Sequence, residues 1–138
     1  MAKKITFFSF LLSLFIGFST ASAQIAIISD LDETIKRTNV ANPARALYNA
    51  LFTQKIFSGM NDLYREMDSY ASDLYVLSAS PKIFRHNIFN LLKKHDFNPV
   101  KVYTRKGLEN KFWYKNNVVK DVLSKDYEKI ILVGDDLE

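Results

Sequence analysis

Residues 25–34 read Ile-Ala-Ile-Ile-Ser-Asp-Leu-Asp-Glu-Thr, an apolar run that ends in two aspartates separated by one leucine. The run is rich in β-branched residues and shows no apolar–polar alternation, which is typical of a strand that is buried on both faces. Such a strand lies inside a parallel sheet that helices cover on both sides. Asp30 and Asp32 follow at the point where this strand ends.

Further short apolar runs predict a sheet of four strands, at residues 25–29, 73–78, 100–103 and 130–133. Apolar residues at helical spacing, together with cap signals at Asn42-Pro43 and Ser80-Pro81, predict helices at residues 44–53, 60–70, 81–95 and 116–123. Strands that alternate with helices form βαβ units with right-handed crossovers. The expected fold is therefore an α/β, Rossmann-like parallel sheet with helices on both faces.

The N-terminus has the pattern of a secretory signal peptide. Lys3 and Lys4 precede an apolar run at residues 5–18, and Ala21-Ser22-Ala23 offers small residues for cleavage before Gln24. The alternative is a retained membrane anchor, but a helix of this length spans only about 21 Å of a roughly 30 Å hydrocarbon core. We expect a signal peptide at 1–23, a domain at 24–138, and a secreted or periplasmic protein.

Composition excludes several classes of protein. The 138 residues are 48% hydrophobic and 25% charged, as in a globular domain. Removal of residues 1–23 leaves 17 basic against 15 acidic residues, and no basic run with aromatic residues is present, so we expect no nucleic-acid partner. The absence of cysteine excludes disulfides, thiol catalysis and cysteine-bound zinc. Composition does not indicate an oligomeric state.

The polar residues of the chain fall at the carboxyl ends of the predicted strands, where parallel sheets bind ligands. These residues are Asp30, Asp32 and Thr34 after the first strand, Ser78, Ala79 and Ser80 after the second, Asp135 and Asp136 after the fourth, and Lys115 at the start of the last helix. Oxygen ligands such as Asp30 and Asp135 suit Mg²⁺, which would offset the repulsion between a nucleophilic carboxylate and a phosphate ester. Asp32 is spaced to serve as the acid and base.

Other residues of this set have more than one interpretation. Ser78 and the N–H groups after it could hold phosphoryl oxygens, whereas Ser80 fits a helix cap better. Lys115 could stabilise transition-state charge, and Lys111 and Lys120 are the alternatives as solvated surface lysines. The string Asp-x-Asp-x-Thr alone is a weak signal, but four motifs in order at predicted strand ends are a strong one.

These four motifs, in this order, resemble those of haloacid dehalogenase-type phosphatases. The segments at residues 29–36, 59–65 and 77–81 are similar, more narrowly, to the phosphatidate phosphatase catalytic domain of the actin-patch-protein type. Glu33, Tyr114 and Asp136 depart from that subfamily, which commonly has Asp, His and Ser there. The resemblance implies Asp30 as the nucleophile, Asp32 as the acid/base, and Ser78 with Ala79 and Lys115 on the phosphate. It also implies Mg²⁺ held by Asp30, Asp32, Asp135 and Asp136, with Thr34 in support.

The expected function is thus an exported, Mg²⁺-dependent phosphomonoesterase, with phosphatidate-like lipid as the leading substrate and peripheral contact with a membrane. The alternatives are a general periplasmic acid phosphatase for small soluble esters and a non-catalytic binding module. Residues 38–58 are too few for a large cap domain, so we expect a minimal cap and an open site. The sheet ends on a fresh strand, so we also expect the domain to be truncated at its C-terminus.

Overall fold

The computed structural model describes residues 24–37, 53–107 and 109–135. These residues form a four-stranded parallel sheet in the order β3-β2-β1-β4. The strands are β1 (Ile25–Asp30), β2 (Asp73–Pro81), β3 (Lys101–Arg105) and β4 (Lys129–Val133). β1 is hydrogen-bonded on both sides, to β2 and to β4, as its continuous apolar run predicts.

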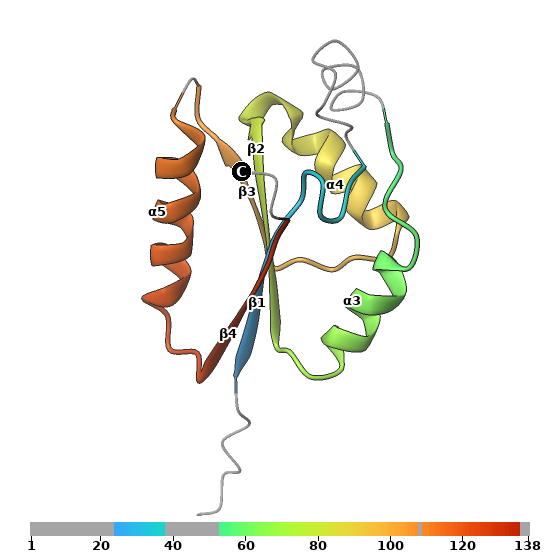
Figure 1. Cartoon of the computed structure of the whole chain (residues 1–138), viewed down its shortest axis with the longest axis vertical. Helices are drawn as coiled ribbons and strands as arrows, with labels where there is room; N and C mark the ends of the chain where they lie inside the picture. The colour runs from blue at the N-terminus through green and yellow to red at the C-terminus, as the bar shows by residue number, and fades with distance from the viewer. Residues whose placement is uncertain (1–23, 38–52, 108, 136–138) are drawn as a thin grey trace, which may run out of the picture.

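Helices cover both faces of this sheet, which confirms the α/β prediction (Figure 1). Alternate side chains of β1 enter two separate cores, with Ile27 on one face and Ala26 and Ile28 on the other. The helices α3 (Met60–Asp68) and α4 (Arg85–Lys94) pack over the first face, and α5 (Lys111–Leu123) packs over the second. The result is a three-layer arrangement in which every strand runs toward the same edge.

The boundaries of three elements, β2, α4 and α5, differ clearly from the prediction. β2 extends to Pro81, which pairs with Arg105 in an extended conformation, so the following helical segment begins later. A 3₁₀ turn, η1 (Lys82–Phe84), comes first, and α4 starts only at Arg85. The prediction that Lys115 opens its helix is also wrong. The Asn110 side chain accepts hydrogen bonds from the N–H groups of Phe112 and Trp113, and this cap starts α5 at Lys111.

Several predictions fall outside the described residues. They are the signal peptide at 1–23, the helix expected at 44–53 apart from Thr53, the extent of the cap, and the placement of Asp136. Within residues 24–37, 53–107 and 109–135, no helix has the length and apolar composition that crossing a bilayer requires.

Candidate functional site

The turn that follows β1 positions the two aspartates. Leu31 continues the ladder with β2 through a 2.7 Å bond from its N–H to the carbonyl of Leu77. Its own carbonyl then accepts from the N–H groups of Ile35 and Lys36, at 3.1 and 2.8 Å, which closes a tight turn. Leu31 and Ile35 are both fully buried and anchor this turn in the core. Asp30 and Asp32 are therefore fixed on either side of a buried leucine.

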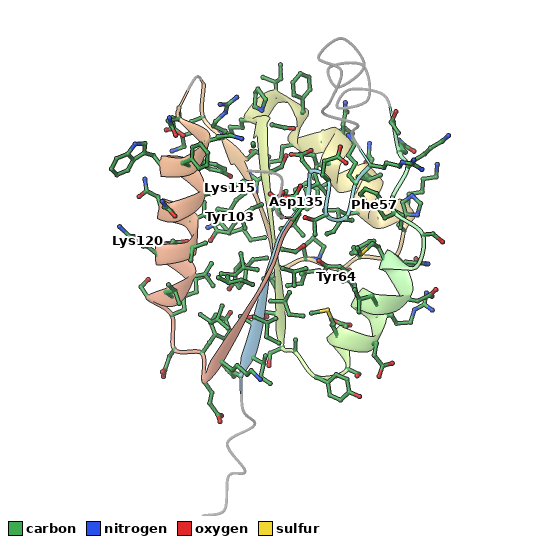
Figure 2. The ribbon with its side chains drawn as sticks, viewed as in Figure 1. Phe57, Tyr64, Tyr103, Lys115, Lys120 and Asp135 are labelled. Atoms are coloured by element: carbon green, nitrogen blue, oxygen red, sulfur yellow. The ribbon has the colours of Figure 1, made fainter. Side chains whose placement is uncertain are left out.

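Asp30 shares a pocket with Lys115 and Asp135. The Lys115 Nζ atom lies 3.3 Å from Oδ1 of Asp30, and the pocket has a volume of about 360 Å³ between α5 and the ends of β1 and β4. Figure 2 shows Lys115 and Asp135 at the same edge of the sheet. Burial raises the pKa of Asp30 from 3.8 to about 6, against the lowering effect of Lys115. The structure thus brings together one acidic residue from β1, one from the end of β4 and a lysine from α5.

Asp32 lies on the other side of the turn, against the end of β2. Its Oδ2 atom accepts a 2.9 Å hydrogen bond from the Ser78 hydroxyl, and the backbone N–H of Ala79 also donates to it. The Ser78 hydroxyl is fully buried and accepts from the N–H of Ser80 at 3.1 Å. Burial raises the pKa of Asp32, while the bond from Ser78 lowers it. Ser78 and Ala79, which sequence analysis assigned to a phosphate, therefore contact Asp32 in this structure.

Lys36 is a site residue that sequence analysis missed. It is 5% exposed, and the turn after β1 places its charge close enough to Asp32 to lower the pKa of that carboxyl. Burial lowers the pKa of Lys36, and Asp32 opposes this shift. From sequence alone, a lysine that follows a motif is expected to be a solvent-exposed surface charge. The signal was its position four residues after Asp32, which a closed turn brings back beside that residue.

Tyr64 is a second residue that sequence analysis treated only as core. This tyrosine comes from α3 and is 5% exposed (Figure 2). Its hydroxyl hydrogen-bonds to the hydroxyl of Ser29, which in turn donates to the carbonyl of Asp30 at 2.9 Å. Because the serine proton points to that carbonyl, Tyr64 is the donor in its own bond. The chain of two bonds ties α3 to the backbone of Asp30.

The donor set at this edge suits a hard divalent cation. Oδ1 of Asp30 is buried and faces the Lys115 ammonium at 3.3 Å, and Asp135 lines the same pocket. Within the described part of the chain, no group of three His, Cys, Asp or Glu side chains is close enough to hold a metal ion. Mg²⁺ needs fewer, because it keeps several waters and is commonly held by one or two carboxylates together with substrate phosphate. Thr34, expected in support, is 5% exposed, and its hydroxyl has no hydrogen-bond partner among the described residues.

The raised pKa of Asp30 predicts how stability depends on pH in the absence of divalent cations. The folded protein holds this proton up to about pH 6, whereas the unfolded chain loses it near pH 3.8. The stability that the proton contributes is complete below pH 3.8 and is lost as the pH rises through about 6. We expect Asp30→Asn to make this fall shallower, as measured by urea unfolding in EDTA at a series of pH values. Asp62→Asn, on an exposed α3 carboxylate, is the control, and equal slopes for Asp30→Asn and the unchanged protein would contradict the prediction.

Comparison with solved structures shows the fold alone. A chain of the Pnkp1/Rnl/Hen1 complex superposes with a TM-score of 0.60 at 18% identity, over 81% of this chain and 38% of that one. A chain of the Pnkp1/Rnl/Hen1 RNA repair complex gives a TM-score of 0.55 at 20% identity, over 81% and 35%. The present chain thus spans little more than a third of each. A search of curated protein sequences found no match.

The match to a protein family spans the residues of the site. The family described as "Phosphatidate phosphatase APP1, catalytic domain" matches residues 25–138, which include both aspartates after β1, Ser78, Lys115 and the acidic pair after β4. The match begins at the first residue of β1 and takes in every described strand and helix. The chain belongs to the family of phosphatidate phosphatase APP1 catalytic domains.

Proposed function

We propose that this chain is an exported, Mg²⁺-dependent phosphatase of the haloacid dehalogenase superfamily that hydrolyses phosphatidate-like lipids through an aspartyl-phosphate intermediate. The observation that carries the proposal is the pocket in which Asp30 lies 3.3 Å from Lys115, with Asp135 beside them at the carboxyl edge of the sheet. The family match supports a phosphate ester as the substrate.

Asp30 and Asp135 would hold the cation, with Asp136 as a further oxygen ligand and Asp32 close by. The lining of the pocket supports this assignment, since it gathers the Asp30 and Asp135 carboxylates near one lysine, and a cation would offset the negative charge that remains. When bound, Mg²⁺ would supply positive charge that neutralises the phosphate oxygens during attack.

In the first step, a carboxylate oxygen of Asp30 attacks the phosphorus atom, and the bond from phosphorus to the ester oxygen breaks. Asp32 donates its proton to the departing oxygen, which leaves as an alcohol. The raised pKa of Asp32 supports this role, because burial keeps the carboxyl protonated at a higher pH than in water. Lys115 offsets the negative charge that gathers around Asp30.

In the second step, Asp32 is the base. It takes a proton from a water molecule whose oxygen attacks phosphorus, the bond from Asp30 to phosphorus breaks, and inorganic phosphate leaves. Asp32 is then protonated again, ready for the next ester. Lys36 and the Ser78 hydroxyl both lower the pKa of Asp32. They would therefore keep the pKa of Asp32 in a range where this carboxyl can serve as acid and base in turn.

Export and an open site complete the proposal. The pattern at residues 3–23 favours a signal peptide with cleavage before Gln24, and hence a periplasmic or secreted enzyme. Residues 38–58 are too few for a large cap domain, which favours a bulky or surface-borne phosphate ester over a small enclosed metabolite. A general phosphatase for small soluble esters is the alternative.

Replacement of the nucleophile tests the mechanism. We expect Asp30→Asn to lower Mg²⁺-dependent hydrolysis of p-nitrophenyl phosphate by roughly 10³-fold or more, because the amide can neither attack phosphorus nor neutralise a cation. The rate is measured by release of p-nitrophenol, with circular dichroism to show that the fold is intact. Asp62→Asn is the matched control and should keep full activity. A fully active Asp30→Asn protein would reject the mechanism, and thermal stabilisation by Mg²⁺ without any turnover would indicate a binding module.

Rates on different esters test the substrate class. We expect kcat/KM for phosphatidate in vesicles to exceed that for nucleoside monophosphates, because an open site accepts an ester that stays in a bilayer. Phosphate release is measured for both substrates under the same Mg²⁺ concentration. The reverse order would favour the general soluble-ester phosphatase.

The mature N-terminus tests export. When residues 1–138 are produced in a bacterium, we expect the periplasmic fraction to contain a protein whose sequence starts at Gln24, because Ala21 and Ala23 carry the small side chains that signal peptidase requires. Intact-mass spectrometry of each cell fraction gives the result. A full-length protein that stays in the membrane fraction would support the retained anchor instead.

A further inference from the structure

A second and larger pocket lies beside the Asp30 pocket under the same helix. It has a volume of about 700 Å³ and lies between α5 and the edge strand β3. Its charged lining residues are Lys82, Arg85, Lys101, Lys106, Glu109 and Asp121. Four of these are basic and two are acidic, so the pocket attracts anions.

The positive charge of this pocket is concentrated toward the carboxyl edge of the sheet. Asp121 lies 3.9 Å from Lys101 and accepts a 2.6 Å hydrogen bond from Tyr103, so Lys101 and Asp121 neutralise each other near the end of α5 and the start of β3. Lys82, Arg85 and Lys106 all follow the ends of β2 and β3, where Glu109 is the acidic lining residue. The basic side chains thus stand at the edge that also carries Asp30 and Asp135.

Large apolar side chains are exposed at the same edge. Ile83 in η1 is 80% exposed, and Phe112 and Trp113 in the first turn of α5 are 50% and 71% exposed. Lys82 and Trp113 line one pocket, so the two segments flank its mouth. Two of these apolar groups adjoin a lysine: Lys82 precedes Ile83, and Lys111 Nζ lies 5.0 Å from the centre of the Phe112 ring. Apolar groups that alternate with lysines in this way are typical of surfaces that lie in a membrane interface.

Two polar groups inside the pocket also lack partners. Nε of Arg85 and the hydroxyl of Tyr114 are buried and make no hydrogen bond within the described residues. Both residues line the pocket, and Tyr114 directly precedes Lys115. An anionic headgroup that entered from the mouth would bring acceptor oxygens to donors that the fold leaves unsatisfied.

We propose that this edge is a docking rim that seats the enzyme on an anionic lipid bilayer, with the docking rim made of Lys82, Ile83, Lys106, Lys111, Phe112 and Trp113. The inference rests on the proposed function, since a lipid phosphate is held in a bilayer and Asp30 must be brought to it. Apolar side chains of the rim enter the headgroup layer while lysines contact anionic headgroups. Both pockets then face the membrane.

Trp113 is the single tryptophan of the chain, so its fluorescence reports the environment of the rim directly. We expect its emission to move to shorter wavelengths when vesicles of phosphatidylcholine and phosphatidylglycerol are added. Pure phosphatidylcholine vesicles should produce little change, and added salt should reverse the shift because it screens the lysines. The measurement needs neither Mg²⁺ nor turnover.

Variants of rim residues, with controls at the far end of α5, assign the binding to the rim. Lys82→Glu combined with Lys106→Glu should weaken binding to the anionic vesicles about tenfold or more, and Phe112→Ala combined with Ile83→Ala about tenfold. Lys120→Glu and Leu123→Ala lie at the opposite end of α5 and should leave vesicle affinity unchanged (Figure 2 labels Lys120). All variants carry the same N-terminal sequence, so any contribution of residues 1–23 cancels. Co-sedimentation gives the affinities.

The outcomes separate docking from catalysis. Hydrolysis of p-nitrophenyl phosphate without a Trp113 response to anionic vesicles would overturn the docking rim and leave the proposed function standing. A Trp113 response to anionic vesicles without any hydrolysis would overturn the proposed function and leave the docking rim standing. Equal weakening by the control variants, or a Trp113 shift with a single-stranded oligonucleotide but not with vesicles, would also overturn the proposal.

Discussion

Parallel pairing of β1 with a strand on each side is the constraint on which the rest of the structure depends. The register pairs Asp30 with Leu77 of β2 and Ser29 with Val133 of β4, so β1 and β4 end at nearly one level while β2 continues past them to Pro81. Because every strand runs the same way, each connection that follows a strand begins at the same edge of the sheet. Asp32, Ser78 and Asp135 are distant in sequence, and each lies toward this shared edge.

The cost of this arrangement is crowded negative charge in a half-buried place. Burial raises the pKa of Asp30 and Asp32, and each carboxylate has a lysine near it, Lys115 from α5 and Lys36 from the turn. The two lysines are not equivalent. Lys115 lines a pocket with Asp30 and is 21% exposed, whereas Lys36 is inside the turn and 5% exposed. The fold therefore compensates one aspartate at the cavity and the other within its own loop.

Sequence predicted the parts of this site that depend on local pattern. The strands are apolar runs, and their carboxyl ends carry the polar residues, so Asp30, Asp135 and Lys115 could be assigned to one edge before the structure was available. The start of α5 could not be predicted in this way. Phe112 and Trp113 are exposed to solvent, so the first buried apolar residue of the helix is Val118. The Asn110 cap was the remaining signal.

The roles of buried polar groups were harder to predict, because they depend on tertiary distance. Tyr64 fits the apolar stripe of its helix, and nothing in that stripe tells that its hydroxyl meets Ser29, which lies 35 positions earlier. Lys36 would be placed on the surface by its residue type, yet the tight turn from Leu31 buries it. Ser78 was expected at the end of its strand, but the strand continues to Pro81, and the serine proton is directed to Asp32.

The position of α5 bears on how an edge that carries aspartates could lie against the anionic bilayer of the proposed docking. An exposed cluster of aspartates would repel a bilayer that carries negative charge. Lys115 offsets Asp30 within the smaller pocket, and Tyr114, its neighbour on α5, lines the basic pocket on the other side. The helix thus divides the edge into a compensated acidic half and a positive half. The two halves adjoin at α5, where consecutive residues, Tyr114 and Lys115, line the basic pocket and the Asp30 pocket in turn.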